Sequence, residues 1–320
     1  MQMGAHAPSV TIAMVVGSQR KRAERALASV LAQPEIHQAE FILLDAGAAD
    51  AHPLAGSEHP IVRTIRTNLG GTFGTLRAMA VRQARAPIVA FVEDHVEVGP
   101  TWLPSVLRSF EGPWAAVGAE IHNANKEVGI SPAIALINYG WWSPPMQAGE
   151  ADLLAGNNTA YRREVLSRYE DRLDELMLSD TVLQWQLAKD GYRLFAEPSI
   201  SIWHLNPTTS GNAIKAEYFY HWAFAALRAR VFDWSAWKRI RYVLLSPAVP
   251  WLRFARLVRL VRSKPPSQSV SVARQSLPIL LFLHAAALGQ NMGLLFGMRD
   301  SDQRFTDFEL NSARPGPLPE

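Results

Sequence analysis

Apolar and polar residues alternate along the first 110 positions in two distinct patterns. Short, nearly continuous apolar runs predict buried strands at residues 10–16, 41–44, 61–65 and 88–92. Apolar residues that recur at steps of three and four predict helices at residues 23–33, 75–85 and 100–110. Strands that alternate with helices predict an α/β fold, in which a mostly parallel sheet is covered by helices on both faces.

The pattern becomes irregular between residues 111 and 153, where Pro, Gly and Asn are frequent. Regular periodicity returns in predicted helices at residues 163–168 and 179–189, and in a predicted strand at 200–203 that ends at His204. After about residue 210 the composition changes. We therefore predict a first domain at 1–210, a helical region at 211–298 and a polar tail, partly disordered, at 299–320.

The helical region combines arginine with apolar residues. Residues 252–262 place an Arg at every third position among Leu, Phe and Val, which predicts an amphipathic helix whose cationic side meets anionic lipid. An ordinary basic surface helix is the alternative. Residues 277–297 are apolar enough either to cross a bilayer or to lie in its interface. Gly289, Gly293 and Gly297 recur every fourth residue, a spacing that predicts close helix packing and a possible homo-oligomer.

Overall composition narrows the function classes. The 320 residues are 48% hydrophobic and include no cysteine, which excludes disulfides, a thiol nucleophile and thiolate metal sites. The formal net charge is only +3, although the pI is near 9.3. We expect no nucleic-acid partner.

Three potential metal ligands, Glu93, Asp94 and His95, follow the apolar run at 88–92 directly. Ligands bind at the carboxyl ends of strands in α/β sheets, so this position suggests a divalent cation site. A solvated turn is the alternative explanation. Further polar residues, Asp45, Asp180 and His204, also fall at predicted strand or loop ends.

Taken in order, these segments resemble the family 2 glycosyltransferases, which have the GT-A (nucleotide-diphospho-sugar transferase-like) fold. Residues 44–50, Leu-Asp-Ala-Gly-Ala-Ala-Asp, are similar to the Val-Asp-Asp-Gly-Ser-x-Asp segment of that family. Leu-Arg-Ala at 76–78 falls where the family often has Ala-Arg-Asn, and Glu93–His95 takes the place of its Asp-x-Asp metal motif. Residues 156–163 resemble the acceptor-side segment, and Ser179-Asp180 lies at the position of the catalytic base. The resemblance covers roughly residues 9–205, and it extends to a membrane-associated subgroup with the Glu-Asp-His motif.

The resemblance implies a role for each matching residue. The expected catalytic base is Asp180, which could also cap the following helix. The expected metal ligands are Glu93, Asp94, His95 and His204, although His204 could instead be a hydrogen-bonded histidine. The expected donor-binding residues are Val16, Asp45, Arg77 and Asp94, with Asp45 alternatively capping its own turn. The expected acceptor-side residues are Trp142, Asn157, Asn158 and Arg162.

The sequence departs from the family pattern at Ala46, Ala78 and His95. Because imidazole is a softer ligand than carboxylate, His95 favours Mn²⁺ over Mg²⁺ as the cation. We expect an inverting, metal-dependent transferase that uses a nucleotide sugar, most readily a UDP-sugar, and a glycan or lipid-linked acceptor. The helical region predicts association with a membrane surface, with the catalytic domain in the cytoplasm. The eroded donor pattern leaves open a catalytically degenerate GT-A domain that serves as a membrane-bound scaffold or partner subunit.

Overall fold

The computed structural model describes residues 7–67, 71–265 and 272–312. The chain divides into two compact units. Unit 1 comprises Met1–Glu120 and Met146–Trp203, and unit 2 comprises Ile121–Pro145 and His204–Glu320. The sequence-based domain boundary at residue 210 differs from this division mainly because residues 121–145 belong with the C-terminal helices.

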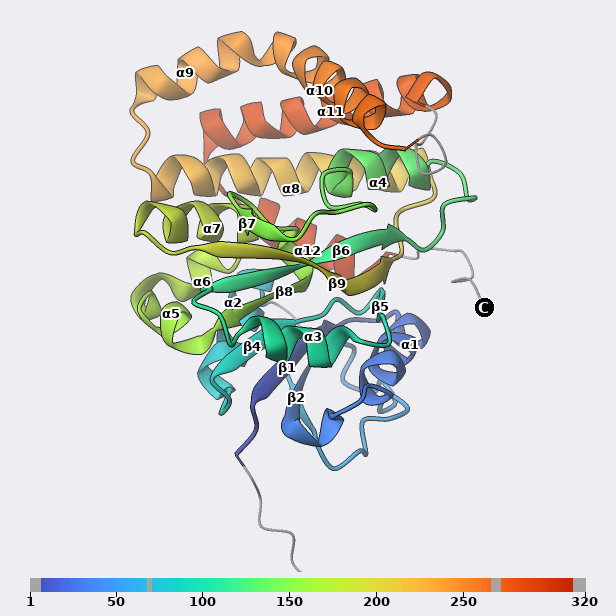
Figure 1. Ribbon diagram of the computed structural model, residues 1–320. Helices are drawn as coiled ribbons and strands as arrows, with labels where there is room; N and C mark the ends of the chain where they lie inside the picture. The colour runs from blue at the N-terminus through green and yellow to red at the C-terminus, as the bar shows by residue number, and fades with distance from the viewer. Residues whose placement is uncertain (1–6, 68–70, 266–271, 313–320) are drawn as a thin grey trace, which may run out of the picture. The chain divides into compact units, whose positions relative to one another are not determined.

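Unit 1 is built on a sheet whose strand order is β3-β2-β1-β4-β8-β6-β9-β5, with β7 paired to β9 (Figure 1). The strands are β1 Val10–Val16, β2 Ala39–Asp45, β3 Val62–Arg66, β4 Ile88–Phe91, β5 Val96–Val98, β6 Ala116–Asn123, β7 Gly149–Ala151, β8 Thr159–Arg162 and β9 Leu194–His204. The first four pair in parallel, whereas β8 runs antiparallel to both β4 and β6. The predicted α/β fold with a mixed, mostly parallel sheet is confirmed.

The helices of unit 1 are α1 Arg20–Leu31, α2 Phe73–Gln83, α3 Trp102–Ser109, α5 Arg163–Ser167, α6 Leu173–Leu176 and α7 Asp180–Lys189. Short 3₁₀ segments lie at η1 Ile36–Gln38, η2 Gly156–Asn158 and η3 Glu170–Arg172. Strands β1, β2 and β4 are almost wholly buried, as their continuous apolar runs predict. The amphipathic pattern of α1 buries Ala23, Ala26, Leu27 and Val30. The buried strands β1, β2 and β4 therefore place their carboxyl ends at fixed positions relative to one another.

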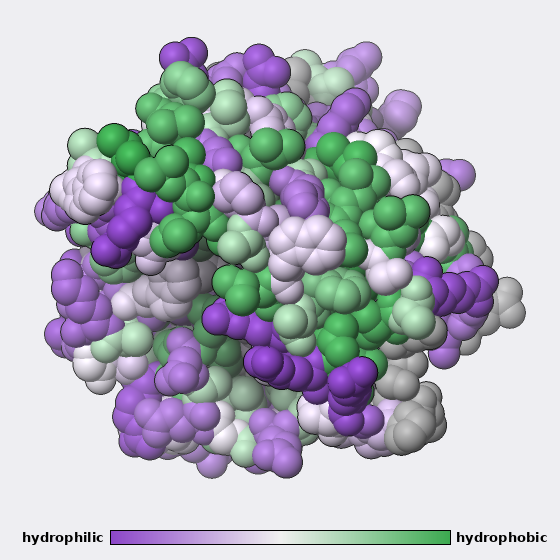
Figure 2. Space-filling model, turned by 90° about the horizontal axis from the view of Figure 1, so that it is seen from above, coloured by the Kyte–Doolittle hydropathy of each residue, from purple (hydrophilic) through white to green (hydrophobic). Residues whose placement is uncertain are grey.

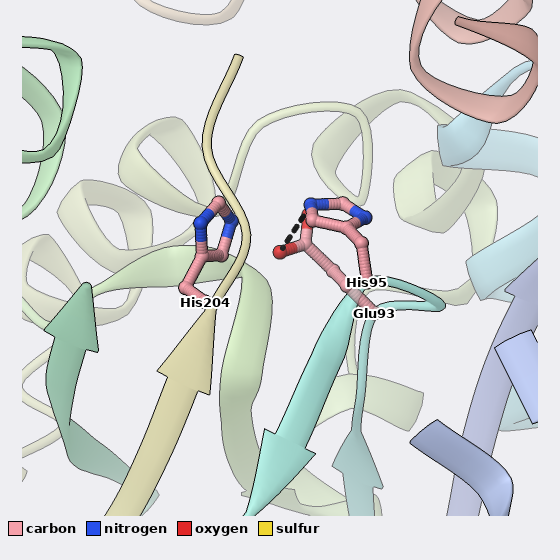
Figure 3. A group of neighbouring side chains, drawn as sticks. All are labelled: Glu93, His95 and His204. Atoms are coloured by element: carbon pink, nitrogen blue, oxygen red, sulfur yellow. Dashed lines mark ion pairs between the residues drawn. The ribbon is translucent and has the colours of Figure 1, made fainter. Parts of the chain in front are cut away.

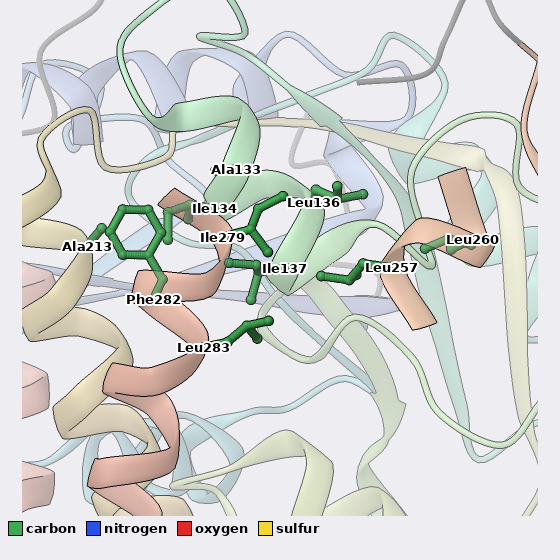
Figure 4. Packing of buried hydrophobic residues seen from close by; sticks show 10 residues of the cluster. All are labelled: Ala133, Ile134, Leu136, Ile137, Ala213, Leu257, Leu260, Ile279, Phe282 and Leu283. Carbon is green, nitrogen blue, oxygen red and sulfur yellow. The ribbon is translucent and has the colours of Figure 1, made fainter. Parts of the chain in front are cut away.

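Unit 2 is helical and contains α4 Ser131–Tyr139, α8 Ser210–Val231, α9 Ala236–Leu245, η4 Ser246–Ala248, α10 Val249–Ser263, α11 Val272–Phe296 and α12 Ser301–Asn311. Its core joins residues far apart in sequence (Figure 4). The cluster consists of Ala133, Ile134, Leu136 and Ile137 of α4, Ala213 of α8, Leu257 and Leu260 of α10, and Ile279, Phe282 and Leu283 of α11. Helix α12 occupies part of the segment expected to be a polar tail, and residues 313–320 of that prediction lie outside the described residues.

Helices α8 and α11 lie side by side (Figure 1). A Cβ added at Gly289 would lie 2.2 Å from the Tyr218 carbonyl O, and one at Gly293 would lie 2.3 Å from the Trp222 carbonyl O. Both glycines therefore serve close packing within the unit. This corrects the prediction that the glycine face joins two copies of the chain, because α8 already covers Gly289 and Gly293. Gly297 has a φ of +74° and follows the end of α11.

Helix α11 is long and apolar enough to cross a membrane by length and composition, and half of its most apolar window is buried inside the structure. A core helix meets the same criterion. The helix thus does not by itself establish a membrane span.

Candidate active site

The predicted donor-site residues Val16 and Asp45 are the last residues of neighbouring parallel strands and face each other in the register of β1 and β2. Asp45 is buried. Its Oδ1 accepts hydrogen bonds from Arg20 Nη1 at 2.7 Å and from the Gly47 backbone N–H at 3.0 Å. The carboxylate therefore caps its own turn and pairs with the first residue of α1. A nucleobase contact by Asp45 stays a prediction.

The turn after β4 and the last residue of β9 supply a group of possible metal ligands, Glu93, His95 and His204 (Figure 3). One ligand atom from each residue lies within 4.8 Å of the others. His95 and His204 are buried, and His95 Nε2 lies 3.5 Å from Glu93 Oε2. His204 Nε2 also lies 3.0 Å from the Tyr139 hydroxyl, so it has a hydrogen-bonding partner as well.

Asp94 lies outside this group of three. Its Oδ2 accepts a hydrogen bond from Arg22 Nη2 at 3.0 Å, and its Oδ1 lies 2.9 Å from His95 Nδ1. Because the Asp94 carboxylate can only accept, His95 Nδ1 donates this hydrogen bond, while Nε2 on the other side of the ring faces Glu93. A carboxylate that orients a histidine in this way is the usual outer-shell partner of a metal-ligating imidazole.

Asn158 holds Glu93 from both sides. Its Oδ1 accepts from the Glu93 backbone N–H at 3.2 Å, and its Nδ2 donates to Glu93 Oε2 at 3.3 Å. Asn158 is therefore placed to position a potential metal ligand. The side chain of Asn157, another predicted acceptor-side residue, lies outside the described part of the structure.

Asp180 is the buried first residue of α7, and Ser179 is the N-cap, with no side-chain capping hydrogen bond. The Asp180 carboxylate accepts from Arg77 Nη1 on Oδ2 at 2.9 Å and from the Tyr161 hydroxyl on Oδ1 at 3.1 Å. The capping role considered for Asp180 is therefore not observed, since both oxygens face other partners.

Two neighbours of Asp180 have altered pKa values. Burial lowers the pKa of Arg77, but the carboxylates of Asp180 and Glu93 outweigh that effect, so the pKa is raised and the guanidinium stays charged. Burial and the Asp180 carboxylate raise the pKa of Tyr161 well above its ordinary value, so its hydroxyl stays protonated and donates. Arg77 thus interacts electrostatically with both the predicted base and Glu93.

Gly156 makes room for Asp180. A Cβ at position 156 would lie 2.4 Å from the Asp180 Cβ and 2.9 Å from Oδ2, a distance that real Cβ atoms do not show. Gln184 adds a further support, because its Nε2 donates to the Tyr161 hydroxyl at 3.3 Å while its Oε1 accepts from the Leu154 backbone N–H at 2.7 Å.

Arg162 and Trp142 both contact backbone groups. The guanidinium of Arg162 donates to the backbone carbonyls of Phe110, Gly112 and Trp114, so it fixes the turn after α3. Trp142 follows α4 in unit 2, where its carbonyl O accepts from the Ile121 N–H at 2.9 Å. An acceptor-side role for either residue stays a prediction.

Two residues of this site, Arg22 and Gln184, escaped sequence reasoning. Arg22 belongs to a basic triplet, which is a weak signal, and Gln184 offered none because it occupies an ordinary helix position. Gly156 and Tyr161 lie in the segment 156–163 that the resemblance singled out, although neither was given a role.

The strand order, the carboxylates at the strand ends and the ligand group after β4 define a nucleotide-sugar transferase of the GT-A class. Residues 11–169 match the family model Glycosyl transferase family 2, and the chain belongs to that family through this domain. It is thus a glycosyltransferase, of the class that transfers a sugar from a nucleotide sugar.

A solved structure with the same fold is the mannosyltransferase PcManGT from Pyrobaculum calidifontis in complex with GDP-Man and Mn²⁺. The two chains are 17% identical, the match covers 89% of this chain and 87% of that one, and the TM-score is 0.54. At this identity the likeness supports the fold alone. A search of curated proteins finds no match.

Proposed function

We propose that the protein is an inverting, metal-dependent glycosyltransferase that moves a sugar from a nucleotide sugar to an acceptor hydroxyl. The observation that carries the proposal is the pairing of one buried carboxylate, Asp180, with a separate group of metal ligands after β4. Inversion needs one base, whereas a covalent double displacement needs an additional nucleophile.

The ligand group suits a divalent transition ion. Two imidazoles and one carboxylate favour Mn²⁺ over Mg²⁺, which prefers an all-oxygen shell. The three ligand atoms lie within 4.8 Å of one another, and His95 Nε2 lies 3.5 Å from Glu93 Oε2. When bound, such an ion would stabilise the negative charge that grows on the departing diphosphate. We assign Glu93, His95 and His204 as ligands and Asp94 as the residue that orients His95.

The chain's own residues carry the remaining steps. Asp180 accepts the proton of the acceptor hydroxyl while that oxygen bonds to the anomeric carbon. The bond from that carbon to the diphosphate breaks on the opposite face, and the nucleoside diphosphate leaves with the electron pair. In the structure each Asp180 oxygen accepts one hydrogen bond, from Arg77 or from Tyr161, and keeps a second lone pair that can accept from the acceptor hydroxyl.

We propose Val16, Asp45 and Arg77 as donor-site residues. Asp45 accepts two hydrogen bonds on Oδ1 and one on Oδ2, so Oδ2 keeps a lone pair that can accept from a base. A UDP-sugar is one candidate donor, and GDP-mannose is another because the structural relative binds it with Mn²⁺. Thermal-shift screening of UDP-, GDP- and dTDP-sugars with Mn²⁺ separates these candidates.

Asp180→Asn tests the base directly. We expect transfer to fall by about 1,000-fold or more, since general-base catalysis typically contributes 10²–10⁴-fold, while donor affinity stays unchanged. Asp171→Asn, at an exposed acidic position of η3, is the matched control and should retain full activity. Full activity in Asp180→Asn would rule out this base.

The metal assignment predicts a difference between two neighbours. His95→Ala removes a ligand and should weaken Mn²⁺ binding, measured by calorimetry, by more than Asp94→Asn, for which loss of an outer-shell partner costs about 10–100-fold. Equal Mn²⁺ affinity in wild type and His95→Ala would contradict the assignment. A wild-type protein that binds neither Mn²⁺ nor any nucleotide sugar would instead support the degenerate scaffold.

We further propose that the acceptor is a cell-surface glycan or a lipid-linked saccharide, and that the enzyme works on the cytoplasmic face of a membrane. The basic, apolar helices of unit 2 support this location. This location is tested by comparing the transfer rate to a lipid-linked acceptor in vesicles with the transfer rate to its water-soluble headgroup. Equal transfer rates to both acceptors would contradict the membrane setting.

A further inference from the structure

Exposed apolar side chains are confined to one unit. Among the described residues, every large hydrophobic side chain that the structure exposes belongs to unit 2. These side chains are Trp141, Trp237, Ile240, Tyr242, Leu244, Leu245, Trp251, Leu252, Leu277, Leu281, Leu288, Leu295 and Phe296. Soluble monomers rarely gather so many on one region, and such a surface usually meets a partner or a membrane.

The same helices carry charge of a single sign. Nine Lys and Arg residues, and no Asp or Glu, occur between Trp234 and Arg299. Exposed cations, among them Arg256, Arg259 and Arg262 of α10, stand beside the apolar residues. Figure 2 shows green and purple side chains interspersed on the face seen from above.

Helices α9, α10 and α11 each contribute an apolar stripe. None of the ten residues of α9 is buried, although the helix carries Trp237, with 68% of its surface exposed, and Leu244, with 70%. On α11, Leu277, Leu281 and Leu288 follow one another at steps of four and seven, which places them on one side of the helix. The exposed Trp251 of α10 lies edge-on to His284 of that side, with ring centroids 5.8 Å apart.

We propose that this face of α9, α10 and α11, here called the helical face, docks in the plane of a lipid bilayer rich in anionic head groups. Tryptophan, tyrosine and leucine would enter the interface, while lysine and arginine meet lipid phosphates. The pattern of a basic, tryptophan-bearing apolar face is that of monotopic helices. The proposal deepens the membrane setting of the proposed function but does not depend on the sugar-transfer chemistry.

A transmembrane span is disfavoured by the opposite side of α11. There, Gly289 and Gly293 lie against the backbone of α8, and α8 buries Glu217 and His221. Inserting α11 across a bilayer would strip away this packing. Self-association through the helical face is also disfavoured. Two such surfaces would bring together cations with no carboxylates between them.

Flotation with vesicles tests the proposal. The full chain should bind vesicles of phosphatidylcholine mixed with phosphatidylglycerol, and should bind phosphatidylcholine alone far more weakly. Arg256→Gln/Arg259→Gln/Arg262→Gln should weaken the partition by about 100-fold. The control Arg168→Gln/Arg172→Gln/Lys189→Gln removes the same charge from exposed positions of unit 1 and should change it little. Trp237→Ser/Leu244→Ser should weaken binding at least tenfold, and its unchanged circular dichroism would show that folding is intact.

Depth of insertion distinguishes docking from spanning. Because the chain contains no cysteine, Leu288→Cys accepts a single environment-sensitive fluorophore without background labelling. Quenchers near the head groups should quench it more than quenchers at the acyl chain ends, and Arg172→Cys in unit 1 should report water. Quenching only at the bilayer centre would indicate a span and overturn the proposal.

Two other results would also overturn it. Equal binding to neutral and anionic vesicles would remove the charge argument, and stable self-association without vesicle binding would identify a second copy as the occupant. Asp180→Asn should bind vesicles like the wild type. Loss of vesicle binding and loss of transfer can therefore be told apart.

Discussion

The two units handle charged and apolar groups in opposite ways. Unit 1 buries its apolar residues and pairs its buried charges, with Arg20, Arg22 and Arg77 each bonded to a carboxylate. Unit 2 exposes many large apolar side chains besides those of its core, and its guanidinium at Arg228 lies among aromatic rings. The difference indicates that unit 1 is organised to hold polar ligands within, whereas unit 2 is organised to present a surface.

The largest expected contrast in stability is between replacing Arg77 in unit 1 and replacing Arg228 in unit 2. Arg77→Met leaves the buried Asp180 carboxylate without its cation and should cost about 3–5 kcal/mol of stability, together with transfer activity. Burial lowers the pKa of Arg228 to about 10, and no described carboxylate forms an ion pair with it. Arg228→Met should therefore change stability by less than about 1 kcal/mol. Urea denaturation measures both, and similar losses in the two variants would contradict the contrast.

Two tightly packed glycines should give effects of intermediate size with different readouts. Gly156→Ala displaces Asp180 and should lower kcat strongly, whereas Gly293→Ala separates α11 from α8 and should cost about 1–3 kcal/mol of stability without a specific loss of kcat. Gly211→Ala is the control, because its added Cβ would meet nothing within 4 Å. Normal kcat in Gly156→Ala would show that Asp180 tolerates displacement.

Two buried glutamates should respond to pH in opposite directions. Burial alone would raise the pKa of Glu40, but hydrogen bonds from Thr11 and from Arg85 lower it below its ordinary value of 4.5. The folded state therefore binds this proton less tightly, and the stabilisation is present above about pH 4.5 and lost as pH falls through the folded pKa. Glu40→Gln should cost about 1–3 kcal/mol at pH 7 and less near pH 3.

The pKa of Glu217 in unit 2 is shifted in the opposite direction to that of Glu40. Burial raises its pKa, although Arg253 and Asn138 oppose the shift. Its contribution is therefore present below about pH 4.5 and is lost as pH rises toward the folded pKa. The change in the free energy of unfolding caused by Glu217→Gln should be more favourable at pH 7 than at pH 4. We expect this difference to be smaller than the loss of stability caused by Glu40→Gln at pH 7. Thermal denaturation across this range measures both, and parallel pH profiles would contradict the assignment.

Sequence patterns identified the elements that are buried on both faces. The apolar run at 10–16 coincides with β1, and the runs at 41–44, 61–65 and 88–92 fall on β2, β3 and β4. Strand β6 was missed because Gly118, Glu120 and His122 interrupt its apolar pattern, and β8 was missed because it has only four residues. Helix α4 was missed because the Gly-rich and Pro-rich surroundings masked nine helical residues.

The sequence predicted those residues of the candidate site that come directly after a strand. Glu93 and His95 share a ligand group, whereas Asp94 between them pairs with Arg22. That the three residues follow a buried strand was available from the sequence. The partners of Asp180 were not, because Arg77 lies 103 residues away in the chain and Tyr161 lies 19 away, distances that only the tertiary fold closes.

The discontinuity of unit 2 has a consequence for synthesis of the chain. Ile134 and Ile137 of α4 are covered by Ile279, Phe282 and Leu283 of α11, which leave the ribosome much later (Figure 4). At ordinary translation speeds the delay between α4 and the end of α11 is roughly 10–30 s. During that time a nascent chain carries an uncovered apolar helix in its middle. A chain shortened before Val272 would keep α8 and α10 but would never cover the side of α4 that meets α11, so aggregation of such a truncated transferase is expected to begin at this helix.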